Sequence, residues 1–138
     1  MIKTSKTYSI GVDIGGTNLR AVLFDGREIL ADYALATPKD NLEHLLIMLN
    51  ALVEPLLDKA VKDKIAVAGV GLGAAGVMDR DRTKILRAPN LALLDGVKLA
   101  EDLESRLNMP VKMDNDVKCF TLAEAKLGAG KKYDNFFV

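Results

Sequence analysis

The stretch that decides the fold is GVDIGGTNLRAVLFD, residues 11–25. Two apolar runs, at residues 8–13 and 19–24, flank a short connection of small and polar residues. Apolar runs of this length beside a glycine-rich connection predict two strands joined by a tight turn. The first run ends in Asp13, so the carboxylate of Asp13 is expected at the rim of a sheet.

The connection between these strands has the features of a phosphate-binding turn. Gly15 and Gly16 leave backbone N–H groups open to an anion, and Thr17 and Asn18 add side-chain donors. The carboxylate of Asp13 would repel a bare phosphate, but it favours a hydrated Mg²⁺ between the two. The turn is therefore predicted to bind phosphate, with Asp13 serving the metal ion through water. A plain hairpin turn, in which the glycines only supply positive φ, is the alternative.

The rest of the chain alternates between strand and helix patterns. Residues 28–36 predict a third strand, and Asp40 or Asn41 is expected to cap the helix that follows. The apolar stripe of that helix is Leu42, Leu45, Leu46, Leu49, Leu52, Val53 and Leu56. Later patterns predict a strand at 65–71, a hairpin around 79–83, a helix at 98–107, a strand at 111–113, a helix at 116–127 ended by Gly128, and a strand at 135–138. The order β-β-β-α-β-α-β predicts an α/β fold with a mixed sheet, whose later strands are parallel and covered by helices.

Composition narrows the class of protein. The 138 residues suit one domain, and 19 acidic residues balance 19 basic residues, so neither nucleic acid nor a membrane surface is expected as a partner. The single cysteine, Cys119, excludes a disulfide framework, and its thiol is expected to be packed. No apolar signal segment precedes the first strand, and the longest uncharged run, residues 65–78, is shorter than the about 20 residues of a membrane span. A cytoplasmic protein is predicted.

A second acidic centre lies in VKMDNDVKCF, residues 111–120, where a short strand ends in Asp114, Asn115 and Asp116. Polar residues at this end of a strand lie where open α/β sheets bind their ligands. Asp116 could accept a proton from a substrate hydroxyl while that oxygen attacks a phosphoryl group. Asn115 could hold a neighbouring hydroxyl. The alternative for Asp116 is a helix N-cap.

Two further residues are weaker candidates. Asn90, in RAPNLALLDG at residues 87–96, either binds a substrate or caps its own loop. Gly76 either lets a substrate approach the backbone or only shapes a turn. GLGAAG, residues 71–76, has the letters of a dinucleotide fingerprint, but no helical periodicity follows it, and GAGKK, residues 128–132, lacks the other positions of a P-loop. Neither of these two segments is predicted to bind a nucleotide.

Together these motifs resemble the ROK family of sugar kinases and sugar-responsive repressors. The matching segments are VDIGGTNLRAVLFD (12–25), GVGLGAAGVMD (69–79), RAPNL (87–91) and DNDVKCFTLAEAKLGAGK (114–131). The resemblance covers essentially the whole chain, but only the N-terminal half of the family. It implies the actin-like ATPase fold, also called ribonuclease-H-like, which agrees with the predicted element order.

The resemblance implies phosphorylation of a hexose or amino sugar, such as glucose, by ATP with Mg²⁺. By this likeness Asp116 is the catalytic base and Asp13 serves the metal. The residues implied at the ATP phosphates are Gly15, Gly16, Thr17 and Asn18. The residues implied at the sugar are Gly76, Asn90, Asn115 and Asp116.

The chain is expected to be a fragment. Residues 1–138 would be the N-terminal subdomain of a ROK-type kinase whose C-terminal domain is absent, and this chain alone is predicted to be inactive. The family's zinc site would belong to the absent half, since this chain has one histidine and one cysteine. The family's behaviour also implies a homodimer.

The chain departs from the family pattern at Val117-Lys118, where Ala-Asn is usual, and Lys118 adds a charge near the site. Two other functions stay open. The domain could be the sugar sensor of a non-catalytic repressor, although such repressors carry a DNA-binding domain ahead of the first strand, and a first strand within ten residues of Met1 argues against this unless the chain is trimmed. It could also be a module of an actin-like assembly protein, which has less need of the Asn-Asp pair.

Overall fold

The computed structural model describes residues 6–132, apart from the side chain of Ala125. Its elements are β1 (Tyr8–Ile14), β2 (Asn18–Phe24), β3 (Ile29–Ala36), α1 (Leu42–Lys62), β4 (Val67–Ala74), β5 (Val77–Met78), β6 (Ile85–Arg87), η1 (Ala92–Leu94), α2 (Leu99–Leu107), β7 (Val111–Asn115), α3 (Asp116–Leu127) and η2 (Ala129–Lys132). They follow the predicted order, with the expected hairpin as β5 and β6. The strand predicted at residues 135–138 lies outside the described residues.

Five of the strands form one mixed sheet in the order β3-β2-β1-β4-β7. β2 pairs antiparallel with both β1 and β3, whereas β1, β4 and β7 run parallel to one another. β4 ends at Ala74 and β7 at Asn115, a few residues later than predicted. Glycines weaken the sequence signal of a strand, but Gly71 pairs with Gly11 and Gly73 with Asp13, and this pairing continues β4.

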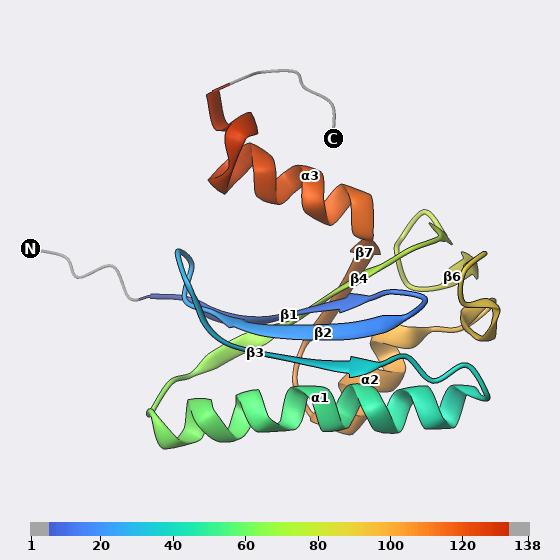
Figure 1. The fold of residues 1–138 in the computed structure, drawn as a ribbon, viewed down its shortest axis with the longest axis horizontal. Coiled ribbons are helices and arrows are strands. Elements are labelled where there is room, and N and C mark those ends of the chain that lie inside the picture. Colours follow the sequence, from blue (N-terminus) through green and yellow to red (C-terminus); the bar gives the residue numbers. More distant parts are fainter. Residues whose placement is uncertain (1–5, 133–138) are drawn as a thin grey trace, which may run out of the picture.

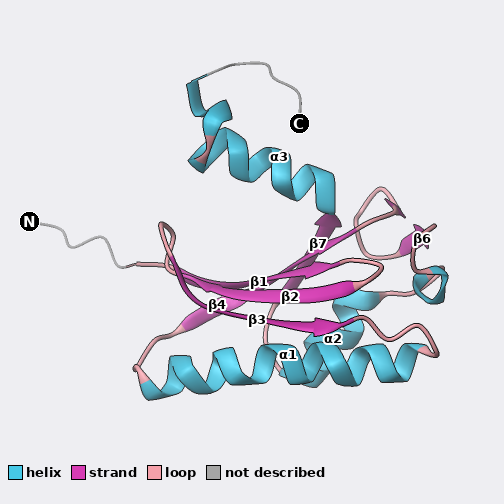
Figure 2. Ribbon diagram, in the orientation of Figure 1, coloured by secondary structure: helices cyan, strands magenta, loops and turns pink. Residues whose placement is uncertain are grey.

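Helices cover the two faces of this sheet unequally (Figures 1 and 2). α1 and α2 lie together against one face, and α3 stands alone on the other side. Alternate residues of each strand point toward the covered face. Ile10, Val12, Leu72 and Met113 are among those that lie in the core there. The predicted stripe of α1 packs there, with Leu42 half-buried and its other members fully buried.

The start of α1 shows which of the two predicted caps is used. Asn41 is the N-cap, and its Oδ1 accepts the backbone N–H of His44 at 2.8 Å. Asp40 instead contacts the imidazole Nδ1 of His44 at 2.7 Å, at the protein surface. Within residues 6–132, no helix is both long enough and apolar enough to cross a lipid bilayer.

The turn between β2 and β3 is organised by the buried carboxylate of Asp25. Its Oδ1 accepts the N–H groups of Glu28 at 2.7 Å and Arg27 at 2.8 Å, and its Oδ2 pairs with Nζ of Lys6 at 3.1 Å. The hydrogen bonds from Glu28 and Arg27, then that from Lys6, lower the pKa of Asp25 to about 2. The folded state is therefore favoured by the ionised form of this carboxyl group.

The exchange Asp25→Asn should destabilise the protein in a pH-dependent way. A carboxyl group with a depressed pKa stabilises the fold above its unfolded pKa of about 4, and this contribution is lost as the pH falls toward about 2. The difference in urea midpoint between the wild type and the variant should therefore be largest above pH 4 and shrink below it. Asp58→Asn, at an exposed site on α1, is the control. A difference that does not change with pH would contradict this role of Asp25.

Candidate functional site

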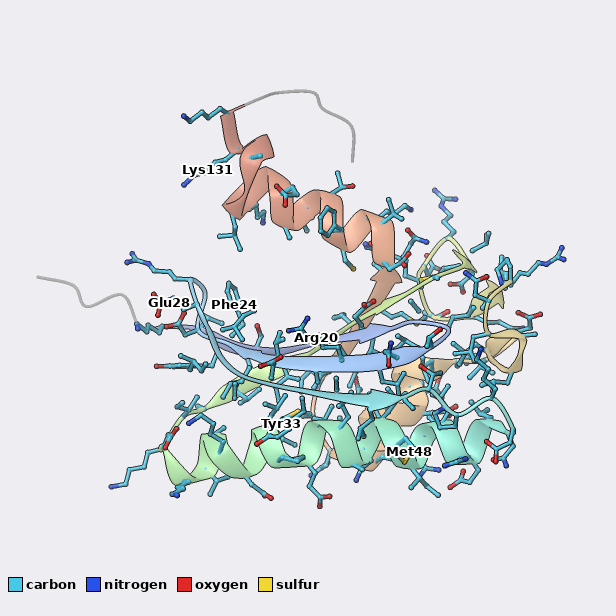
Figure 3. All side chains as sticks on the ribbon, viewed as in Figure 1. Arg20, Phe24, Glu28, Tyr33, Met48 and Lys131 are labelled. Atoms are coloured by element: carbon cyan, nitrogen blue, oxygen red, sulfur yellow. The ribbon has the colours of Figure 1, made fainter. Side chains whose placement is uncertain are left out.

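One row of residues crosses the sheet on the face turned toward α3. The strand register places Asp114 of β7, Gly73 of β4, Asp13 of β1 and Arg20 of β2 side by side. Figure 3 shows Arg20 on this side of the sheet. Because Gly73 has no side chain, the carboxylates of Asp13 and Asp114 flank an open position at the carboxyl edge of the parallel strands.

α3 begins directly over this open position. A Cβ atom on Gly73 would lie 3.6 Å from the Cα of Asp116 and 3.6 Å from the Sγ of Cys119. Asp116 is the first residue of α3, but the N-cap is Asn115, whose Oδ1 accepts the N–H groups of Val117 and Lys118 at 3.0 and 3.3 Å. The alternative role of Asp116 as the N-cap is therefore wrong. Its Oδ1 accepts only the N–H of Val117, at 2.8 Å, which leaves Oδ2 without a hydrogen bond among the described residues.

Asp13 and Asp116 are close enough to act on each other electrostatically. Asp13 is exposed but partly desolvated beside α3, which raises its pKa; the negative charge of Asp116 raises the pKa further, and Arg20 opposes both effects. Two carboxylates that repel each other form a site that a cation would stabilise. Among residues 6–132, no three acidic, histidine or cysteine side chains are grouped so as to hold a metal by themselves. The donors present fit Mg²⁺, which is usually held by one or two carboxylates together with water and substrate phosphates.

A hollow of about 670 Å³ lies between α3 and the sheet, and it contains this pair of acids. Its lining includes Gly11, Asp13, Arg20, Asp116, Cys119 and Phe120. Cys119 is exposed, so the prediction of a packed thiol is wrong. Its Sγ lies close to Gly73, and this partial loss of solvent, followed by the charges of Asp114, Asp116 and Asp13, raises the pKa of the thiol, which disfavours the reactive thiolate.

The predicted phosphate turn follows β1, and Thr37 is hydrogen-bonded to it. The N–H of Gly15 donates to the carbonyl of Asn18 at 3.0 Å, and the N–H of Thr37 donates to the carbonyl of Thr17 at 2.9 Å. The hydroxyl of Thr37 donates to the carbonyl of Gly15 at 2.8 Å. Thr37 is buried, and sequence reasoning missed it; the available signal was a polar residue placed between an apolar strand and Pro38.

The residues predicted at the sugar fall into two groups. Asn90 lies against the phosphate turn, since a Cβ on Gly16 would be 3.1 Å from the carbonyl oxygen of Asn90. Asn115 instead donates from Nδ2 to the carbonyl of Gly76 at 2.9 Å, which ties the turn after β4 to the start of α3. Because Asn115 also caps the helix, a single N–H of its amide is left for a ligand.

Gly76 occupies a backbone conformation and a space that only glycine fits. Its φ is +153°, and a Cβ there would lie 2.5 Å from the carbonyl oxygen of Arg87. The turn therefore brings the backbone at Gly76 close to both the hairpin strand β6 and Asn115.

Comparison with known proteins yields one family and several longer relatives. The ROK family model matches residues 9–138. The N-acetylgalactosamine kinase of Shewanella sp. (strain ANA-3) is 35% identical over 124 residues, which are 89% of this chain and 38% of the kinase. The xylose repressor of Caldicellulosiruptor bescii is 30% identical over 132 residues, which are 94% of this chain and 33% of the repressor. The relatives thus include a sugar kinase and a transcriptional regulator at similar identity.

Among solved structures, the chain resembles a ROK family glucokinase from Streptomyces griseus in complex with glucose and AMPPNP. The TM-score is 0.81 at 34% identity, and the match covers 92% of this chain and 39% of the glucokinase. This likeness confirms the predicted α/β fold of the actin-like ATPase class. The chain spans less than two fifths of the length of each of these three relatives.

Thr37→Val should change the environment of the phosphate turn, whereas Thr37→Ser should preserve it. Valine keeps the shape of threonine but cannot donate to the carbonyl of Gly15, which belongs to the same peptide group as the N–H of Gly16. The amide resonance of Gly16 in a ¹H–¹⁵N spectrum should therefore move in the valine variant and stay near its wild-type position in the serine variant. Equal shifts in both variants would show that the hydroxyl does not hold the turn.

Gly76→Ala should lower the free energy of unfolding by roughly 2 kcal/mol or more, because a side chain there is strained in φ and meets the carbonyl of Arg87. Gly71→Ala is the matched control, since a Cβ on Gly71 meets nothing within 4 Å. Urea unfolding of the two variants measures the difference. A Gly76→Ala protein as stable as the Gly71→Ala protein would contradict the close packing at this turn.

Proposed function

Because the chain belongs to the ROK family, we propose that residues 1–138 form the N-terminal portion of an ATP-dependent hexose kinase that acts on glucose or a related sugar. The observation that carries this proposal is the acidic pair at the carboxyl edge of the sheet. Within residues 6–132, Oδ2 of Asp116 accepts no hydrogen bond; Asp116 and Asp13 line one hollow, and Asp13 lies just before the glycine turn in the chain. Sensing a sugar requires neither a general base nor a second carboxylate near it, so this pair favours a kinase over a regulator.

Asp116 acts as the general base in this reaction. Its Oδ2 accepts the proton of a sugar hydroxyl as the sugar oxygen forms its bond to the γ-phosphorus of ATP. The bond between that phosphorus and the bridging oxygen breaks, and ADP leaves with the electron pair. The hydrogen bond from the N–H of Val117 to Oδ1 fixes the orientation of the carboxylate during the transfer.

The turn after β1 binds the phosphates. Gly16 presents its backbone N–H group, whereas the N–H of Gly15 donates to the carbonyl of Asn18 and shapes the turn, and the exposed side chains of Thr17 and Asn18 add donors. Asp13 would hold Mg²⁺ through water, and the ion, when bound, would neutralise charge on the phosphates. Thr37 keeps the turn in place from the side of β3.

Gly76, Asn90 and Asn115 orient the sugar so that one hydroxyl faces Asp116. Asn115 contributes the N–H that its bond to Gly76 leaves over, and Gly76, which packs against Arg87, holds Asn115 in place for this contact. Asn90 lies against Gly16, which brings the sugar side and the phosphate turn together. The relatives extend well beyond the span of this chain, so we assign the activity, and any homodimer or zinc site, to the complete protein.

The test is phosphoryl transfer by the complete polypeptide that carries residues 1–138, with ATP, Mg²⁺ and a panel of hexoses and amino sugars. Asp116→Asn should lower kcat by roughly 10²–10⁴-fold, because the general base is lost, while the thermal midpoint should be no lower than that of the wild type, because the repulsion with Asp13 is relieved. Asp58→Asn on α1 removes the same charge far from the site and should keep full activity. An Asp116→Asn enzyme that retains more than about a tenth of wild-type kcat would refute the role of Asp116.

The xylose repressor among the relatives supports one other function, a sugar-sensing regulator without catalysis. Sugar binding by the complete polypeptide, with no phosphorylated product from any sugar in the panel, would favour that function over the kinase.

A further inference from the structure

A second hollow, of about 540 Å³, lies where β7 passes into α3. We call it the polar pocket, and the residues that matter in its lining are Gly76, Arg80, Arg82, Asp114, Asn115 and Lys118. It contains two of the residues assigned above to the sugar, Gly76 and Asn115, but not the Asp13–Asp116 pair.

Two cross-links fix the walls of the polar pocket. Asn115 donates to the carbonyl of Gly76 at 2.9 Å, and Nη1 of Arg82 pairs with Oδ2 of Asp114 at 3.0 Å. Both links run from the end of β7, one to the turn after β4 and the other to the loop between β5 and β6. The pocket is therefore built from three segments that hold one another in place.

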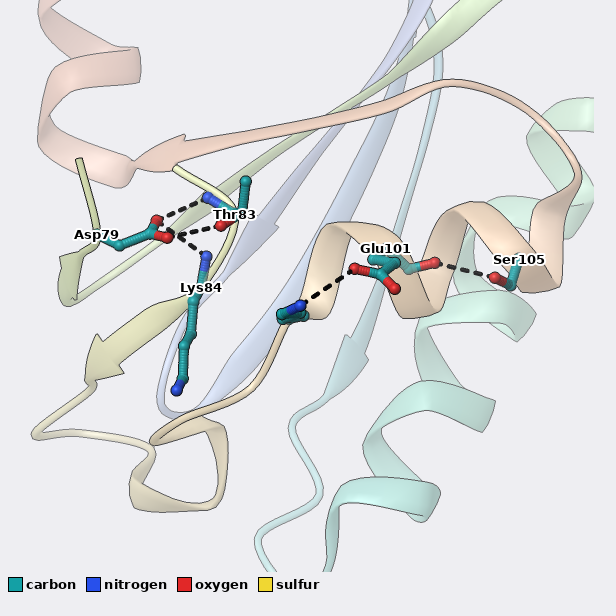
Figure 4. A network of polar contacts seen from close by, with 6 residues as sticks. Asp79, Thr83, Lys84, Glu101 and Ser105 are labelled. Atoms are coloured by element: carbon teal, nitrogen blue, oxygen red, sulfur yellow. Dashed lines mark hydrogen bonds and ion pairs between the residues drawn. The ribbon is translucent and has the colours of Figure 1, made fainter. Parts of the chain in front are cut away.

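The loop between β5 and β6 is itself well braced (Figure 4). The carboxylate of Asp79 accepts the N–H and the hydroxyl of Thr83, at 2.7 and 2.6 Å, and the N–H of Lys84 at 3.0 Å. These bonds make Asp79 a structural residue of the loop, and they position the segment that carries Arg80 and Arg82.

The charges of the polar pocket do not balance. Its two acids are already engaged, Asp79 with its loop and Asp114 with Arg82 and the N–H of Asn115. Arg80 and Lys118 form no ion pair with any of residues 6–132. The lining carries three cations, Arg80, Arg82 and Lys118, against the two acids, so one positive charge is in excess beside the proposed sugar residues.

The charge of Lys118 is attracted by Asp114, whose pKa it helps to lower, but it is opposed by the dipole of its own helix. It lies in the first turn of α3, the end of a helix at which the backbone dipole disfavours a positive side chain. Local preferences that a protein violates tend to coincide with its functional sites. An anion in the polar pocket would satisfy both Lys118 and Arg80.

We propose that the polar pocket recognises an anionic substituent, a carboxylate or a phosphate, on the sugar substrate, with Arg80 and Lys118 as its counter-charges. The inference rests on the proposed function, because it places the sugar at Gly76 and Asn115. Arg80 can bind a carboxylate or phosphate through two parallel N–H bonds, and Lys118 acts as a point charge. Among sugars related to glucose, the preferred substrate is then one that carries an acidic group.

The experiment follows the amide resonances of Gly76 and Asn115 in the 138-residue chain as ligand is added at low ionic strength. The probes are glucose, glucuronate, glucose 1-phosphate and inorganic phosphate alone. Each exposed ion pair is expected to strengthen binding by about fivefold, so the two charged sugars should bind several times more tightly than glucose. Arg80→Gln and Lys118→Gln should each remove part of that preference. Arg27→Gln and Lys62→Gln remove the same charges away from the polar pocket and should leave it unchanged.

Each result decides the matter. The proposal is supported if the charged sugars bind more tightly than glucose and only Arg80→Gln and Lys118→Gln reduce this preference. The affinities of glucuronate and glucose 1-phosphate then show which anion is preferred. Charged sugars that bind no more tightly than glucose overturn it, while the kinase proposal stands if the complete polypeptide phosphorylates neutral sugars. Inorganic phosphate binding as tightly as glucose 1-phosphate marks an adventitious anion site and also overturns it. If no sugar shifts either resonance, this proposal fails. The kinase proposal is tested separately, by the phosphoryl-transfer assay on the complete polypeptide.

Discussion

The parallel pairing of β1, β4 and β7 is the constraint on which the rest of the site depends. Asp13 and Asp116 are far apart in the chain, and only this pairing brings the ends of their strands to one edge of the sheet. The register matters as much as the pairing, because it sets Gly73 between Asp13 and Asp114 and so leaves room for α3 to begin there. A slip by one residue would turn these carboxylates into the core.

The two faces of the sheet differ in what they carry. On one face, α1 and α2 bury alternate residues of the strands and provide the apolar core. On the other face, α3 covers the sheet incompletely and leaves a hollow beside charged groups. The apolar core and the candidate site therefore use different side chains of the same strands. Because successive side chains of a strand point to opposite faces, the two sets lie on opposite sides of the sheet.

Local patterns in the sequence were enough for the elements and for most of the candidate residues. The apolar period located α1, and the glycine turn after Asp13 and the Asp-Asn-Asp segment marked the two ends of the site. What the sequence could not show depends on contacts between distant segments. Asn115 was predicted only as a sugar ligand because its cap and its bond to Gly76 are three-dimensional facts, and Thr37 was missed because its partner lies on another strand. The end of β4 was placed too early since glycine hides a strand that pairing supports, and the exposure of Cys119 depends on how far α3 stands from the sheet.

The repulsion between Asp13 and Asp116 has a consequence for how such a domain evolves. Two like charges held together cost folding free energy for as long as no cation accompanies them. A lineage selected only for robustness to heat would gain by neutralising one of the two acids, and it would keep the same fold. On the function proposed above, a substitution that removes one of these acids would therefore raise thermal stability and remove a residue of the reaction at the same time.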